Sequence, residues 1–324
     1  MAFRLSGSSR PTRTLLAALV VASVAVPLSG VARPAAVPAP APVAAARAPL
    51  TAATPAALDA RYAVNRAGIE AAEKAADGHG DRRRAAALRA MDAPDRHFLA
   101  FDGRNGGRTA EVFGDLAHAD RVAVLVPGSD TSLDTYGRLR AGAEALERQM
   151  GERAAVVAWL GYATPATFSP EAATSGRAES AAPQLDTFIG QLNAVKPSAR
   201  ISLLCHSYGS VVCARAAPGL PVAALVLYGS PGTGVPDVGH LHTRAAVWAG
   251  RGSGDWIADV PHLRLPLLFT TVGFGADPLS KGFGAHVFDA GSGGHSDYLR
   301  PGSVSLRNIA RIASGLQPTE ERHA

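Results

Sequence analysis

The chain has 324 residues, of which 47% are hydrophobic and 18% charged, and its formal net charge at pH 7 is +5. This hydrophobic content is enough for a substantial core and excludes a chain that is disordered throughout. Arg4, Arg10 and Arg13 supply part of the charge, and no later basic cluster is interleaved with aromatic residues, so we expect no nucleic-acid partner.

Residues 1–32 have the pattern of a secretory signal peptide. Basic residues precede the apolar run LLAALVVASVAV at 15–26, and small residues follow it. Because this run is shorter than the roughly 20 residues that span a bilayer, we expect cleavage rather than a permanent anchor, and no stable membrane insertion afterwards. The protein is therefore predicted to be secreted, either extracellular or associated with the cell surface. An Ala/Pro-rich segment at 33–56 follows, and its composition is typical of a flexible linker.

The predicted helices and strands begin after this linker. Residues 57–94 have a helix-forming composition that is interrupted at DGHGD, which predicts two surface helices. Two strand patterns then flank the NGG sequence at 105–107, a strong hairpin signal because Asn and Gly accept a positive φ. The apolar run RVAVLV at 121–126 is nearly continuous, as expected for a strand buried on both faces.

Helical and strand patterns alternate from there to a last helix. This order predicts one α/β domain over 95–318, followed by a tail at 319–324. We expect a mostly parallel central sheet with an antiparallel N-terminal hairpin and helices on both faces. In such sheets the chemistry gathers at the carboxyl ends of the strands.

Ser207 lies in the sequence CHSYG at 205–209, between the strand pattern RISLLC and a helix of small residues. A strand that turns directly into a helix exposes the residue at the turn and needs small residues two positions before and after it. Gly209 meets this requirement, and Cys205 meets it approximately. The pattern predicts Ser207 as a nucleophile; the alternative is a serine that caps an ordinary helix.

Cys205 and Cys213 are the two cysteines of the chain. An even count in a secreted protein favours a disulfide. However, one cysteine follows a strand and the other lies about two turns into the next helix, so we expect them to be too far apart to bridge. The sequence therefore predicts two buried free thiols.

A serine nucleophile needs a base, and with this motif the acid and then the histidine follow it along the chain. Of the ten histidines, His295 lies in a glycine-rich loop directly after the last predicted strand, from which it can reach back over the sheet. Asp255 follows a strand through the turn GSGD. We therefore predict His295 as the base and Asp255 as the acid that orients it. The other candidates for the acid are Asp277 and Asp237, while Asp297 is expected to organise the histidine loop.

An acyl-transfer site also needs donors for the developing oxyanion. One is predicted to be the backbone N–H of Tyr208. The second is expected from the loop after the strand VAVLV, where Gly128 permits close approach and Ser129 or Asp130 can aim an N–H at the site. Thr131 and Asp134 have capping-box spacing, which indicates a rigid turn, although an ordinary tight turn is the alternative. Ser129 is the donor we predict.

Five motifs in this order resemble a bacterial α/β-hydrolase family of largely unassigned specificity: VLVPGSDTSLDTY, VVAWLGY, CHSYGSVV, GDWIADVPHLRL and GHSDYL. The resemblance covers about residues 95–316. It implies the α/β-hydrolase fold, with Ser207 as nucleophile, Asp255 as acid and His295 as base, and it implies no substrate. Cys205 departs from the glycine that usually stands at this position.

These features together predict a secreted serine hydrolase that cleaves a small-molecule carboxylic ester through an acyl-enzyme. The alternatives are a peptidase or amidase with the same triad, and a non-catalytic cell-surface binding module on a hydrolase scaffold. Loops at 163–183 and 231–244 are long enough to overhang the site but are not strongly apolar, which favours short or medium acyl groups or a polar ester. No metal-ligand spacing and no phosphate loop stands out, so no cofactor is expected.

Overall fold

The computed structural model describes residues 38–260, 265–266 and 271–319. The predicted signal peptide, the first part of the linker and most of the tail lie outside the described residues. Among the described helices, none combines the length and the apolar character that a membrane crossing requires.

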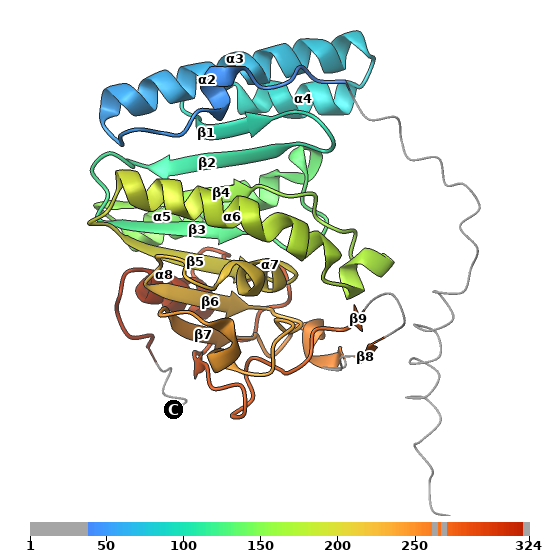
Figure 1. Cartoon of the computed structure of the whole chain (residues 1–324), viewed down its shortest axis with the longest axis vertical. Coiled ribbons are helices and arrows are strands. Elements are labelled where there is room, and N and C mark those ends of the chain that lie inside the picture. The colour runs from blue at the N-terminus through green and yellow to red at the C-terminus, as the bar shows by residue number, and fades with distance from the viewer. Residues whose placement is uncertain (1–37, 261–264, 267–270, 320–324) are drawn as a thin grey trace, which may run out of the picture. The chain divides into compact units, whose positions relative to one another are not determined.

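Eight strands form the central sheet in the order β1-β2-β4-β3-β5-β6-β7-β10 (Figure 1). The pairs β1–β2 and β2–β4 are antiparallel, and all the remaining pairs are parallel. The predicted mostly parallel sheet with an antiparallel N-terminal hairpin is therefore confirmed. The strands are β1 (His97–Asp102), β2 (Arg108–Gly114), β3 (Arg121–Val126), β4 (Ala154–Leu160), β5 (Arg200–His206), β6 (Ala224–Tyr228), β7 (Ala246–Gly250) and β10 (His286–Val287), with β8 (Leu265–Pro266) and β9 (Thr271–Val272) in a separate antiparallel pair.

Helices cover both faces of this sheet, as the sequence predicts. One core lies between the sheet and α6–α7, and a second lies between the sheet and α4, α5 and α8. Strand β4 is buried along its whole length, which explains its unbroken apolar sequence. The helices are α2 (Ala44–Arg47), α3 (Pro55–Gly78), α4 (Arg82–Met91), α5 (Gly137–Met150), α6 (Gly176–Val195), α7 (Gly209–Ala216) and α8 (Val304–Ala313); short 3-10 turns are η1 (Leu133–Thr135), η2 (Pro170–Ala173), η3 (Val238–Leu241) and η4 (Trp256–Asp259).

Helices α3 and α4 lie beside β1, at the hairpin end of the sheet (Figure 1). The part of the predicted linker that the structure describes packs here as well, although its composition gives no sign of this. Arg61 of α3 donates hydrogen bonds to the backbone carbonyls of Ala46 and Ala48. Backbone acceptors are available in any sequence, so an Ala/Pro-rich segment can be held in place without side chains of its own.

Candidate active site

The turn between β5 and α7 carries Ser207, which has a φ of 52°. This left-handed conformation is costly for a residue with a side chain, so the surroundings must hold it. The Ser207 N–H donates to the Tyr228 carbonyl at 3.0 Å, and the Ser207 carbonyl accepts from the Ser210 N–H at 2.9 Å. The backbone on both sides of the serine is thereby fixed, and the side chain lies at the carboxyl end of β5.

Two glycines allow the close packing around this turn. A Cβ on Gly209 would lie 2.6 Å from the Val126 carbonyl oxygen, and a Cβ on Gly128 would lie 2.6 Å from the Cβ of Ser207. Such distances are far inside van der Waals contact, so neither position has room for a side chain. Residue 209 must therefore be small because the start of α7 packs against the end of β3.

Cys205 and Cys213 form a disulfide with a Cα–Cα distance of 6.4 Å. The prediction of two free thiols is wrong. It treated the helix as leading away from the strand, whereas the sharp turn at Ser207 folds α7 back over β5, and the rise from Gly209 to Cys213 is only about 6 Å at 1.5 Å per residue. Cys205 stands at the position usually held by glycine. Its side chain is directed towards α7, where it forms the disulfide bond to Cys213.

Ser207, His295 and Asp255 form one continuous hydrogen-bonded chain. His295 Nε2 lies 2.9 Å from Ser207 Oγ, and His295 Nδ1 lies 2.9 Å and 3.0 Å from the two carboxylate oxygens of Asp255. Asp255 is 2% exposed and Ser207 is 9% exposed. With Nδ1–H donated to the carboxylate, the lone pair of Nε2 faces the serine hydroxyl, which is the arrangement that a general base requires.

The other candidate acids have different partners. Asp277 forms an ion pair with Arg251, and Asp237 is hydrogen-bonded to His240. Asp297 accepts a hydrogen bond from the Gly294 N–H, so it organises the loop that carries the histidine. Of the four carboxylates, the structure brings Asp255 to His295.

Tyr298 is a further residue of this cluster, and sequence reasoning missed it. Its hydroxyl donates to Asp255 Oδ2 and accepts from the Gly252 N–H. Burial alone would raise the pKa of Asp255, but hydrogen bonds from His295, Tyr298 and the backbone of Ile257 outweigh it and hold this pKa below its usual value. The carboxylate therefore stays ionised next to the imidazole. Only its place three residues after His295 in GHSDYL connects Tyr298 with the site in the sequence.

His206 contacts His295 through its ring and through a hydrogen bond to the backbone. Its Nε2 lies 2.8 Å from the backbone carbonyl oxygen of His295. The imidazole rings of His206 and His295 lie 4.8 Å apart, and the ring of Tyr228 stacks on that of His206 at 5.1 Å. Burial, and after it the charge of His295, lowers the pKa of His206 to about 3. A neutral His206 can donate Nε2–H to that carbonyl and so hold the loop.

We expect His206 to make the protein less stable in mild acid. Its pKa is about 3 in the folded protein, whereas a histidine in an unfolded chain has a pKa near 6.5. Between these values the unfolded chain binds a proton that the folded protein does not, so the free energy of unfolding falls as the pH falls. For this group the loss is roughly 1–2 kcal/mol between pH 6.5 and 5.

Urea unfolding at pH 7 and pH 5 measures this effect, and a His206→Gln variant is the control. Glutamine keeps an N–H donor but does not titrate, so the variant should lose less stability between the two pH values. The same loss in both proteins would show that another group is responsible.

The loop after β3 is hydrogen-bonded to the loop after β4. Asp130 has a φ of 59°, its N–H donates to the Pro165 carbonyl at 2.9 Å, and its carboxylate accepts from the backbone and hydroxyl of Thr167. The Asp130 N–H is therefore engaged, which leaves Ser129 of the two predicted donors. Within the described parts of the chain, neither Ser129 nor Tyr208 donates its backbone N–H to another group.

The capping box lies one residue later than the sequence spacing predicts. Ser132 and Thr135 form it at the start of η1. The predicted pair of Thr131 and Asp134 is wrong because Asp134 instead forms an ion pair with Arg84 of α4 at 2.5 Å and 2.8 Å. Hydrogen bonds from Thr135 to Asp130 and from Ser132 to Thr135 nevertheless hold this turn.

Two aromatic side chains are exposed on segments connected to the site. Phe168, in the predicted overhanging loop, is fully exposed, and this loop is tied to the turn that carries Ser129. Trp256 is 48% exposed, and its ring lies 4.9 Å from that of His295. An apolar part of a ligand can therefore find contacts here. In the described residues no group of His, Cys, Asp or Glu is arranged to hold a metal ion.

A family model described as alpha/beta hydrolase matches residues 102–265 of the chain. The protein belongs to this alpha/beta hydrolase family. The match includes Ser207 and Asp255 and ends before His295.

Among curated proteins, this chain is similar to an uncharacterized protein of Mycobacterium tuberculosis, at 32% identity over 254 residues. That alignment covers 67% of this chain and 38% of the relative, so the chain spans well under half the length of this relative. An uncharacterized protein of Mycobacterium bovis is 35% identical over 135 residues, which cover 37% of this chain and 50% of the relative.

Three solved structures illustrate what the comparison with known structures found for this chain. An α/β serine hydrolase without a lid from Xanthomonas campestris has a TM-score of 0.43 at 17% identity and covers 70% of this chain and 98% of its own. Esterase PE8 has a TM-score of 0.45 at 16% identity, covering 64% and 99%. Esterase LipW from Mycobacterium marinum has a TM-score of 0.41 at 16% identity, covering 75% and 88%.

Proposed function

We propose that this alpha/beta hydrolase is a secreted serine hydrolase that cleaves carboxylic esters through an acyl-enzyme. The observation that carries the proposal is the hydrogen-bonded chain from Asp255 through His295 to the strained Ser207. A serine hydroxyl is a weak nucleophile, and a base in contact with its oxygen is the feature that activates it. A capping serine would need no such partner.

In the proposed mechanism, Ser207 Oγ attacks the ester carbonyl carbon while its proton passes to His295 Nε2. The tetrahedral oxyanion accepts hydrogen bonds from the backbone N–H groups of Tyr208 and Ser129. His295 then gives its proton to the departing alcohol oxygen, which leaves an acyl group on Ser207. A water molecule repeats the sequence, with His295 again as base, and releases the carboxylic acid. Throughout, Asp255 fixes the imidazole tautomer and stabilises the imidazolium.

The proposed substrate is a small molecule with a short or medium acyl group. The exposed ring of Trp256 lies 4.9 Å from that of His295 and supplies an apolar contact, and Phe168 is exposed on a loop that is hydrogen-bonded to Asp130. The proposal of secretion has two supports. One is the basic and apolar pattern of residues 1–32, and the other is the disulfide, because disulfides form and persist in oxidising compartments.

A fluorophosphonate probe tests the proposal on the full-length protein. We expect one adduct, located on Ser207 by mass spectrometry, because a fluorophosphonate reacts with an activated serine and not with an ordinary hydroxyl. The protein should also hydrolyse p-nitrophenyl butyrate much faster than the corresponding p-nitroanilide.

Heat-denatured protein is the control and should remain unlabelled. Faster turnover of the anilide would make the protein an amidase or peptidase with the same triad. A folded protein that neither reacts with the probe nor hydrolyses either substrate would instead be a binding module on a hydrolase scaffold.

A further inference from the structure

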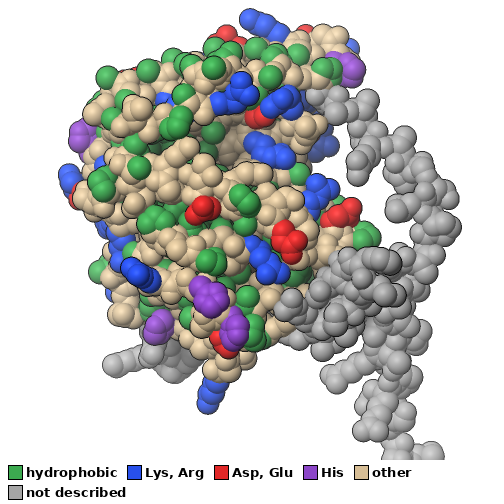
Figure 2. Space-filling view, in the orientation of Figure 1, with side chains coloured by type: hydrophobic (Ala, Val, Ile, Leu, Met, Phe, Trp, Pro, Cys, Tyr) green, Lys and Arg blue, Asp and Glu red, His purple; other side chains and the backbone are tan. Residues whose placement is uncertain are grey.

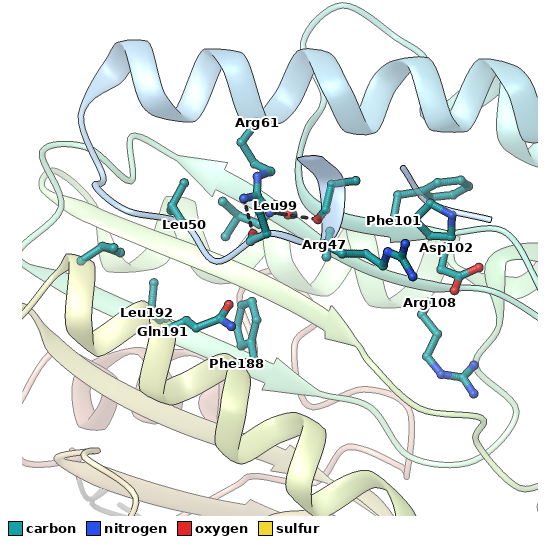
Figure 3. A pocket seen from close by; sticks show the side chains of 15 residues that line it. Arg47, Leu50, Arg61, Leu99, Phe101, Asp102, Arg108, Phe188, Gln191 and Leu192 are labelled. Atoms are coloured by element: carbon teal, nitrogen blue, oxygen red, sulfur yellow. Dashed lines mark hydrogen bonds between the residues drawn. The ribbon is translucent and has the colours of Figure 1, made fainter. Parts of the chain in front are cut away.

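A cavity of about 300 Å³ lies at the hairpin end of the sheet, away from the serine site. It is bounded by α2 and α3 on one side and α6 on the other, and its remaining walls come from β1 and β2 (Figure 3). In the strand order, β4 and β3 separate β2 from β5, which carries Ser207. Figure 2 shows a hollow below α3 with Lys and Arg side chains gathered beside it. None of the triad residues lines this cavity.

One part of the cavity is apolar. Leu50 contributes from the segment after α2, and Phe188 and Leu192 reach in from α6 (Figure 3). The volume of about 300 Å³ is at the lower end of the range found for small-molecule sites. This part of the cavity fits a hydrocarbon chain.

The other part of the cavity carries positive charge. Arg47, Asp102 and Arg108 line it; in Figure 3 the guanidinium of Arg47 faces Asp102, whereas that of Arg108 is turned away from both. Asp102 neutralises them only in part, because Arg104 already donates to both of its oxygens at 2.9 Å and 2.7 Å. Among the described residues, Arg47 has no hydrogen-bond or ion-pair partner, and Arg108 donates only to the Gly107 carbonyl, at 3.3 Å.

Arg108 is a partly buried cation, and the nearby carboxylate of Asp102 is shared with Arg104. Burial lowers its pKa, the charge of Asp102 raises it, and the charge of Arg177 lowers it further. A guanidinium that loses water without gaining an anion is unfavourable, so this end of the cavity favours an incoming negative charge. Arg61 is not available for this purpose, because its guanidinium donates to the backbone of Ala46 and Ala48.

We propose that this cavity binds an amphipathic monoanion, specifically a medium-chain alkyl carboxylate. The ligand's carboxylate lies between Arg47 and Arg108 and accepts hydrogen bonds from both guanidinium groups once they turn towards it, since the planar guanidinium matches the geometry of a carboxylate. The alkyl chain lies against Phe188 and Leu192. This is a binding site separate from the hydrolytic one, and it does not depend on the proposed reaction.

Isothermal titration calorimetry of the full-length protein with sodium decanoate, kept below its micellar concentration, tests the proposal. We expect saturable binding of one decanoate per chain. Decan-1-ol, which lacks the charge, and butyrate, which lacks the chain, should each bind at least about tenfold more weakly. Equal affinity for decanoate and decan-1-ol, or no saturation by decanoate, would overturn the proposal.

Variants then locate the site. Arg47→Gln and Arg108→Gln should each weaken decanoate binding by about tenfold or more, the loss typical of a charge-assisted hydrogen bond. Arg148→Gln, on the exposed surface of α5 behind the sheet, should bind as the unaltered protein does. Arg47 is exposed and unpaired in the described structure, so its variant is expected to fold even if the Arg108 variant does not. Decanoate binding that survives the Arg47 and Arg108 substitutions lies elsewhere, for example at the hydrolytic site, and refutes the assignment.

Discussion

Replacing Ser207 with alanine should lower kcat for p-nitrophenyl butyrate by about 10⁶-fold, the size of the loss when the nucleophile of a serine hydrolase triad is removed. The variant loses the only atom that can form the acyl-enzyme in the proposed mechanism. The fold should persist, because the turn is held by backbone hydrogen bonds of residue 207 and not by its hydroxyl. Steady-state kinetics and far-ultraviolet circular dichroism measure the two expectations.

The matched control is Ser180→Ala, which removes an exposed hydroxyl from α6. It should retain full activity and full labelling by a fluorophosphonate. A Ser207→Ala protein that hydrolyses the ester at the original rate would refute the nucleophile assignment and with it the proposed function.

Replacing Asp255 with asparagine should lower kcat by about 10⁴-fold, as in other triads. The carboxylate accepts Nδ1–H from His295, whereas an asparagine amide can donate to Nδ1 and so stabilise the opposite tautomer. Nε2 would then carry a hydrogen towards Ser207 and could not accept its proton. The variant also lacks the charge that stabilises the imidazolium. Kinetics at pH 7 with the same ester measure the loss.

Tyr298→Phe separates this effect from a general disturbance of the cluster. It removes the hydrogen bond to Asp255, together with the one that the hydroxyl accepts from the Gly252 N–H, and leaves the carboxylate in place. We expect a loss of about tenfold or less, the size of one hydrogen bond. A Tyr298→Phe variant as inactive as Asp255→Asn would mean that packing and not the tautomer accounts for the loss. If Asp277→Asn caused the 10⁴-fold loss instead, Asp277 would be the acid.

The parts of the site that were predictable from the sequence are those that local chain geometry determines. A buried strand followed at once by small residues defines the turn at Ser207, and a loop after a parallel strand must emerge at the carboxyl edge of the sheet. That is why Asp255 and His295, 40 residues apart in the chain, could be placed at one site and are found in contact.

The parts that were missed depend on contacts between distant segments. The disulfide depends on how far α7 folds back over β5, which the residue types alone do not specify. Tyr298 and His206 bond to groups on other loops, and an exposed tyrosine or histidine would have the same sequence context. The choice between Ser129 and Asp130 required the Pro165 carbonyl, which comes from the loop after β4.

The members of the Ser207–His295–Asp255 chain have unequal structural support. Ser207 follows β5, a strand paired on both sides in the middle of the sheet, and a disulfide ties that strand to its helix. His295 follows β10, which pairs with β7 at the sheet's margin through only His286 and Val287. Strands with few pairings open locally at a lower free-energy cost than the interior of a domain. We therefore expect that heating displaces His295 from Ser207 before the core unfolds, so that loss of the proposed activity precedes global unfolding.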